Sequence, residues 1–180
     1  SVFTTRADTL FGVTFLVISA QHPNLMDIVT KDKKKEVEKF LNKTKSTKQE
    51  DINQLEKEGI FTGNYAVHPI TKEEIPIWTG NFVLAEYGSG MVMAVPAHDF
   101  RDYQFAKKYN IPIKVVVKPG EKNTNTGNIK EAFTDYGVLV NSSNFDGLSS
   151  EEAKEHISVY LKEKGLGEKI SYEPLGVICN

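Results

Sequence analysis

The sequence predicts an α+β fold in which a β-barrel core is flanked by helices. The prediction rests on about seven short apolar or β-branched runs and on three helical segments placed between them, a pattern typical of a closed sheet covered on the outside. The 180 residues suffice for one domain with a substantial core. We find no internal repeat and no interior boundary. We therefore predict a single domain over residues 1–180, with a tail at 173–180 that we leave unassigned.

The strands are predicted from β-branched and aromatic runs bounded by Gly, Pro and Asn. A polar turn at 71–74 separates two of them and predicts a hairpin. Seven runs lie at 1–5, 10–20, 59–69, 75–78, 91–95, 113–117 and 138–140, and a weaker last one lies at 170–172.

Helices are predicted at 31–48, at 99–109 and from 149 to Gly165, with a shorter one at 24–28. Ser149 and Glu152 have the spacing of a capping box. In the 31–48 helix, apolar residues at helical spacing predict one buried stripe below a solvated lysine face. An RNA-binding patch there is the less favoured interpretation, because acidic residues dilute the lysines. The polar stretches 43–51 and 119–128 are predicted to be linkers.

The composition is that of an ordinary soluble globular protein, with 39% hydrophobic and 26% charged residues. A net charge of −2 supplies no general attraction for nucleic acid, so we expect any RNA contact to be local and expect no DNA partner. Cys179 is the only cysteine, which fits a reducing compartment, and we expect a cytoplasmic protein. No apolar run approaches the roughly 20 residues of a membrane span. The chain begins at Ser1 without an initiator Met or a signal peptide, and we expect it to be a piece of a larger protein.

Residues 84–103 form the most informative stretch. Glycines at 88 and 90 predict a sharp turn, residues 91–95 a buried strand, and Pro96 its end. Asp99 then stands where a helix N-cap is expected. The strand therefore delivers His98, Asp99 and Asp102 to one rim, at the positive end of a helix. Local pattern alone slightly favours a structural interpretation, in which the aspartates serve the helix and His98 is an ordinary loop residue.

A second stretch places hydroxyls between two predicted strands. Thr4, Thr5 and Thr9 surround Arg6 in a polar crossing. Taken singly, each threonine is explained by its preference for strands.

Together the two stretches resemble one known family. Thr-Thr-Arg-Ala-Asp-Thr-Leu-Phe-Gly at 4–12 and Gly-Ser-Gly-Met-Val-Met-Ala-Val-Pro-Ala-His-Asp-Phe-Arg-Asp at 88–102 are similar to motifs of the editing domain of bacterial-type leucyl-tRNA synthetases, the insertion called connective polypeptide 1. Gly-Val-Leu-Val-Asn-Ser at 137–142 and Phe-Asp-Gly-Leu at 145–148 resemble the same family. The resemblance runs from Ser1 to about residue 170. Ala7 stands where the family usually has proline, and the His-x-Gly-His and Lys-Met-Ser-Lys-Ser signatures of a synthetic site are missing, so we expect no leucine activation or ATP use by this piece.

The resemblance implies hydrolysis of the ester between a wrong amino acid, such as norvaline or isoleucine, and the terminal adenosine of tRNALeu. It implies that Asp102 pairs with the substrate ammonium, that Thr9 excludes leucine, and that Thr4 and Thr5 hydrogen-bond the substrate and the attacking water. It further implies that Arg6 contacts the terminal nucleotide. For His98 and Asp99, support of the loop and contact with the adenosine both stay open. The walls for the side chain and adenosine are expected from Leu84, Tyr87, Met93 and Val95.

The chemistry needs no cofactor or metal, because an aminoacyl ester is already activated and a positioned water can hydrolyse it. No His/Cys cluster has zinc-ligand spacing, and His22, His68 and His156 are expected on the surface. The expected partners are the 3′ end of tRNALeu and the catalytic domain of a parent synthetase. The alternatives are an editing domain of the isoleucine or valine enzymes, a non-catalytic RNA-binding module of the same fold, and a barrel whose motifs arose by chance.

Overall fold

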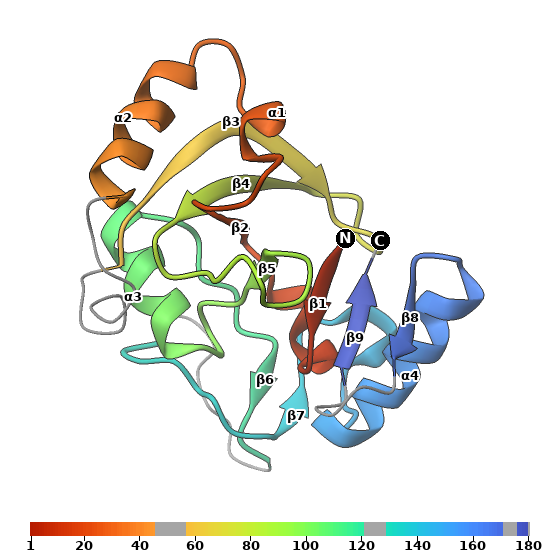
Figure 1. Cartoon of the computed structure of the whole chain (residues 1–180). Coiled ribbons are helices and arrows are strands. Elements are labelled where there is room, and N and C mark those ends of the chain that lie inside the picture. The colour runs from red at the N-terminus through yellow and green to blue at the C-terminus, as the bar shows by residue number, and fades with distance from the viewer. Residues whose placement is uncertain (46–56, 121–128, 171–175, 180) are drawn as a thin grey trace. The chain divides into compact units, whose positions relative to one another are not determined.

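The computed structural model describes residues 1–45, 57–120, 129–170 and 176–179 (Figure 1). The chain folds into two compact units. One consists of Ser1, Phe3–Thr14 and Ala94–Asn180, and the other of Val2 and Phe15–Met93. We call them the terminal unit and the central unit. The larger parts of the predicted linkers at 43–51 and 119–128, and residues 171–175 and 180, lie outside the described residues.

The central unit is built on a four-stranded sheet with the order β3-β4-β2-β5. The buried strand β2 (Phe15–Ser19) pairs in parallel with β4 (Glu74–Gly80), with Leu16 opposite Ile77. On the other side of β4, β3 (Gly59–Val67) pairs antiparallel through the predicted hairpin. The four-residue strand β5 (Met91–Ala94) forms the opposite edge. All five residues of β2 are buried, as expected for an apolar strand with neighbours on both sides.

Strand β3 has a register shift between Phe61 and Tyr65. Gly63 lies inside it with φ at +85°, and a Cβ at this position would lie 1.9 Å from Thr30 Oγ1. Only glycine accepts both the backbone angle and the close approach.

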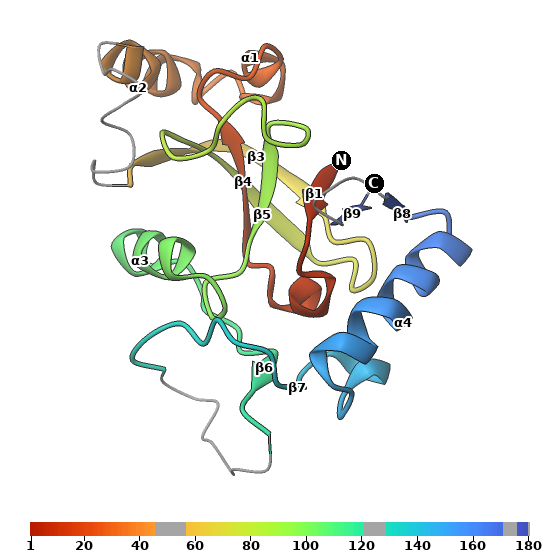
Figure 2. The same ribbon diagram turned by 60° about the horizontal axis from the view of Figure 1, so that its bottom comes forward.

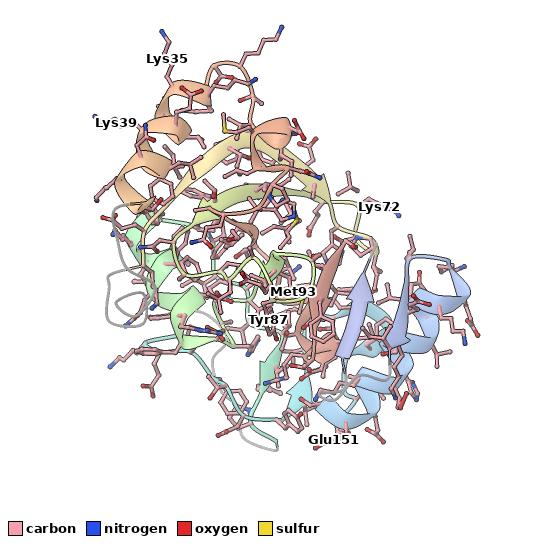
Figure 3. All side chains as sticks on the ribbon, in the orientation of Figure 1. Lys35, Lys39, Lys72, Tyr87, Met93 and Glu151 are labelled. Atoms are coloured by element: carbon pink, nitrogen blue, oxygen red, sulfur yellow. The ribbon has the colours of Figure 1, made fainter. Side chains whose placement is uncertain are left out.

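Two helices belong to the central unit, α1 (Leu25–Ile28) and α2 (Lys34–Lys45). Val37 of α2 is fully buried and the helix packs on β3. Lys35 and Lys39 are exposed and extend outward from the helix (Figure 3). The solvated lysine face is confirmed, and of the predicted apolar stripe Val37 is buried while Phe40 and Leu41 are half-buried.

The terminal unit combines short strands with the two longer helices of the C-terminal half (Figure 2). Helix α3 (Phe100–Tyr109) begins after Asp99, and α4 (Ser150–Glu163) begins with the predicted capping box of Ser149 and Glu152. Helix α4 packs on the strand β8 (Gly167–Ile170) and on the 3₁₀ helix η1 (Ala7–Gly12). The remaining elements are β1 (Val2–Thr4), β6 (Val117–Lys118), β7 (Val138–Leu139), η3 (Ser143–Phe145) and β9 (Gly176–Cys179).

The predicted closed β-barrel is wrong for the described residues. Their strands form three separate sheets of three, four and two strands, ordered β1-β9-β8, β3-β4-β2-β5 and β6-β7. Two expected strands are shorter than predicted. Residues 10–12 are the end of the 3₁₀ helix η1, and the run 113–117 contributes only Val117 to a ladder. The mixed α/β character is confirmed, but too few residues remain in ladders to close a single barrel.

The unassigned tail carries a strand. Strand β9 lies between β1 and β8, antiparallel to β8 with Gly167 opposite Cys179. It therefore joins β1, the first strand of the chain, and β8 in one sheet. No helix among the described residues has both the length and the apolar character needed to cross a membrane.

Candidate functional site

The polar crossing after β1 is a tight 3₁₀ turn organised by one carbonyl. The Arg6 carbonyl accepts hydrogen bonds from the Thr9 backbone N–H (3.0 Å) and from Thr9 Oγ1 (2.8 Å). The Arg6 N–H donates to Thr4 Oγ1 (3.0 Å). Thr4 and Thr9 are buried and Thr5 is exposed. The three threonines are therefore inequivalent, since Thr4 and Thr9 are held by the backbone and Thr5 faces solvent.

The Arg6 side chain neutralises a buried carboxylate. Arg6 Nε and Nη2 donate to Asp8 Oδ1 (3.0 Å) and Oδ2 (2.9 Å), and the Asp8 side chain has no exposed surface. Such a paired, two-point contact satisfies a charge that would be costly to bury alone. Arg6 Nη1 also donates to the Thr134 carbonyl (2.9 Å), far away in the sequence.

Asp102 lies in the first turn of α3 and accepts a hydrogen bond from Val95, the residue that follows β5. Its Oδ2 accepts from the Val95 N–H at 2.9 Å, and its side chain is almost entirely buried. Burial, with a smaller contribution from the nearby Asp99 charge, raises the pKa of the Asp102 carboxyl to about 7, against opposing effects of the Val95 N–H and Arg101. The carboxyl is thus poised between its neutral and charged forms near neutral pH.

Asp99 is the N-cap of α3, as predicted. Its Oδ1 accepts from the N–H groups of Arg101 (2.8 Å) and Asp102 (3.1 Å). The structural interpretation of Asp99 is therefore correct, and the same charge acts on the Asp102 pKa.

His98 is a buried residue that hydrogen-bonds to two other stretches of the chain, and not an ordinary loop residue. Its Nε2 accepts from the N–H groups of Val116 (3.0 Å) and Val117 (3.2 Å), so the ring proton lies on Nδ1 and is donated to the Phe133 carbonyl at 3.0 Å. Burial lowers the pKa of His98, against the favourable bond to Phe133. The neutral imidazole therefore joins three separate stretches of the terminal unit.

The expected wall residues are divided between the two units. Val95 is buried in the terminal unit, whereas Leu84, Tyr87 and Met93 belong to the central unit. Leu84 and Tyr87 expose 47% and 49% of their surface, and Met93 is buried. Tyr87 and Met93 are labelled in Figure 3. Leu84 and Tyr87 offer apolar surface on which a ligand can pack.

The glycine turn before β5 is as tight as predicted. Gly90 has φ at +69°, and its N–H donates to the Tyr87 carbonyl at 2.9 Å. A Cβ there would lie 2.7 Å from the His22 ring, whose Nε2 lies 3.1 Å from the Ser89 carbonyl oxygen. The Gly90 backbone therefore lies close to the His22 side chain.

A third stretch, which sequence reasoning missed, connects the two motifs. The Phe133 N–H donates to the Ala97 carbonyl (2.8 Å), the Phe133 carbonyl accepts from His98, and the Thr134 carbonyl accepts from Arg6. We call residues 133–136 the bridging segment. Its bonds use backbone atoms, so no side-chain pattern announces them.

The remaining histidines differ from expectation at one position. His68 is buried, and its Nδ1 accepts from the N–H groups of Ile70 (3.2 Å) and Thr71 (3.1 Å), which fixes the hairpin turn. His156 is exposed, as predicted. Within the described part of the chain, no group of three or more His, Cys, Asp or Glu side chains is arranged to hold a metal ion.

The comparisons with known proteins identify the family of the chain. The family model described as "Leucyl-tRNA synthetase, editing domain" matches residues 1–162. Leucine–tRNA ligases of Citrifermentans bemidjiense and Fervidobacterium nodosum are 48% and 49% identical over 93% of this chain, which spans 21% and 20% of their length. A crystal structure of an Agrobacterium radiobacter LeuRS in a ternary complex with tRNA and LeuAMS superposes with a TM-score of 0.67 at 29% identity, over 91% of this chain and 17% of that one. The chain belongs to the family of leucyl-tRNA synthetase editing domains.

Proposed function

We propose that this chain hydrolyses the ester of mischarged tRNALeu, with norvaline or isoleucine as the wrong amino acid, and spares leucyl-tRNALeu. The observation that carries the proposal is the Asp102 carboxyl, buried at the start of α3 and held by the Val95 N–H. An ammonium group is its natural ligand, because a nearby positive charge favours the carboxylate and removes the cost of burying it. Asp102 thereby anchors the aminoacyl end of the substrate.

Hydrolysis then requires a positioned water and no protein nucleophile. The water oxygen attacks the ester carbonyl carbon, the bond to the ribose oxygen breaks, and the proton lost by water ends on the ribose hydroxyl. Thr5 exposes its hydroxyl at the surface of the crossing, and the buried Thr4 lies beside it. These hydroxyls are suited to hold the water and the ester oxygen, and fixing both in place supplies much of the rate.

Thr9 is suited to act as the gate against leucine. Its hydroxyl is committed to the Arg6 carbonyl, which fixes χ1 and therefore the direction of its methyl group. A wall that cannot swing aside can refuse a γ-branched side chain while admitting isoleucine or norvaline. One methyl group in a pocket distinguishes two substrates by about 1–3 kcal/mol. An editing site must add discrimination in this range to that of the synthetic site.

The partners follow from the same proposal. Arg6 meets the 3′-terminal adenosine nucleotide, and Leu84, Tyr87, Met93 and Val95 are the proposed contacts of the side chain or the base. The catalytic domain of a parent synthetase delivers the tRNA end, and the cytoplasm is the expected compartment. The relatives support this proposal, because each is a leucine–tRNA ligase about five times longer than this chain.

Deacylation of isoleucyl-tRNALeu by the purified chain tests the proposal. Asp102→Asn keeps an oxygen for the Val95 N–H but removes the charge, and the rate should fall by about 100-fold or more because the ester is no longer held. Asp27→Asn, an exposed aspartate of α1, is the matched control and should leave the rate unchanged. An Asp102→Asn protein that hydrolyses the ester at the parent rate refutes the ammonium site.

A further inference from the structure

Tyr136 is an exposed aromatic ring with two cations against it. It exposes 48% of its surface. The Arg6 guanidinium carbon lies 4.8 Å from its ring centroid and Lys154 Nζ lies 4.2 Å from it. Lys154 Nζ also donates to the Tyr136 hydroxyl. Because the ring is half exposed, packing in the core does not explain its position against the two cations.

Hydrogen bonds to the Asp8 carboxylate and to the Thr134 carbonyl hold the Arg6 guanidinium in place. A guanidinium has five N–H donors, and the bonds to the described residues use three of them. One N–H on each terminal nitrogen is left for a ligand, and the side chain is 22% exposed.

An aromatic ring is the suitable support for such an arginine. It contacts the guanidinium by its π-face, so it consumes no N–H donor. A second carboxylate in place of the ring would accept from the N–H groups that Asp8 and the Thr134 carbonyl leave available. Those N–H groups could then not bind a phosphate or ribose oxygen.

We propose that Tyr136 is a positioning residue for Arg6, and that Lys154 holds the ring by its hydroxyl. The ring restrains the guanidinium so that its two remaining N–H groups meet a phosphate or ribose oxygen of the terminal nucleotide. The bridging segment thus contributes a substrate-positioning side chain to the site, 130 positions away from Arg6 along the chain. This inference rests on the proposed role of the chain in tRNA editing.

Two variants separate the ring from the hydroxyl. Tyr136→Leu removes the ring, and Tyr136→Phe keeps it while losing the bond to Lys154. Tyr65→Leu is the matched control, because Tyr65 exposes 49% of its surface in the central unit.

The first readout is the Arg6 Nε–H signal in ¹⁵N NMR, which does not depend on activity. Tyr136→Leu should move this resonance and lower its order parameter, Tyr136→Phe should largely restore both, and Tyr65→Leu should change neither. An Arg6 signal that is unaffected by Tyr136→Leu, or affected equally by Tyr136→Phe, overturns the proposal. Because this readout needs no turnover, it tests the positioning even if the parent chain fails to deacylate tRNA, a failure that would instead count against the proposed function.

The second readout is the steady-state deacylation of isoleucyl-tRNALeu. Tyr136→Leu should raise KM about two- to five-fold at nearly constant kcat, since a partly exposed cation–π contact contributes in that range and acts on binding. A change in kcat alone, or an unchanged KM in a folded variant, contradicts the assignment.

Discussion

Replacing Asp102 with asparagine should make the folded chain more stable while it removes editing. The pKa of the carboxyl rises by about three, from an ordinary 3.8 to about 7, because the fold buries it. Each pKa unit corresponds to about 1.4 kcal/mol, so holding the charged form in the fold costs up to about 4 kcal/mol above pH 7. Asparagine keeps an oxygen for the Val95 N–H and carries no such cost.

The stability that Asp102→Asn gains over the parent depends on pH. Between about pH 4 and pH 7 the folded parent keeps a proton on Asp102 that the unfolded chain has released, so the parent loses stability as the pH rises through this interval. The free energy of unfolding of Asp102→Asn minus that of the parent should therefore grow from near zero at about pH 4 to its plateau above pH 7.

Urea unfolding followed by circular dichroism at several pH values measures this difference, with the exposed Asp27→Asn as a control that should show no such trend. A difference that is flat between pH 4 and pH 8, or that falls as the pH rises, refutes the reasoning. A difference that grows with pH as predicted would show that Asp102 destabilises the fold, which is expected of a residue retained for function.

Three further predictions follow from the contacts of the terminal unit. Asp99→Asn keeps an N-cap oxygen but removes a charge that helps to raise the Asp102 pKa. The acid limb of the deacylation–pH profile should therefore move to lower pH. An unmoved limb would count against an effect of the Asp99 charge on Asp102. Thr9→Ala should hydrolyse leucyl-tRNALeu and lose about 1–3 kcal/mol of discrimination, whereas Thr9→Val keeps the wall and should spare it; equal behaviour of the two in a deacylation assay would remove Thr9 as the gate. His98→Leu leaves two buried N–H groups without an acceptor and should lower the free energy of unfolding by about 3 kcal/mol, measured in urea. The contribution of His98 to the stability of the parent should fall as the pH drops below 6.5, because the folded His98 resists protonation. The free energy of unfolding of the parent minus that of His98→Leu should therefore decrease there, and a difference that does not change with pH would contradict the burial of a neutral His98.

The sequence predicted the local structure well where one residue type dictates the backbone. Pro96 ends β5, Asp99 caps α3, and Ser149 with Glu152 forms the capping box of α4. These signals act within one helical turn, so they are visible without knowledge of the fold.

The closed barrel could not be predicted correctly, because ladder formation depends on distant partners. The run at 10–12 is apolar and was expected to be a strand, yet it ends a 3₁₀ helix. That helix exists because the Arg6 carbonyl takes both the backbone and the side-chain donor of Thr9. The tail strand β9 was missed for the same reason, since it is defined by its pairing with β1 and β8.

The sequence names candidate site residues but does not show how they are connected to the rest of the fold. The neighbours of His98 in the sequence indicate a loop residue, and its burial depends on N–H groups at Val116 and Val117, in another stretch of the chain. The bridging segment has no side-chain signal for its two carbonyl contacts. The contacts of the Tyr136 ring with Arg6 and Lys154 are formed by the fold and cannot be inferred from the sequence around Tyr136.

The most direct test of the central claim is the ratio of kcat/KM for isoleucyl-tRNALeu to that for leucyl-tRNALeu, measured with this chain. If a rigid Thr9 wall refuses leucine while Asp102 holds the ammonium, the ratio should reach about 100, within the range that one misplaced methyl group allows. A ratio near one, with leucyl-tRNALeu hydrolysed as fast as isoleucyl-tRNALeu, would contradict it.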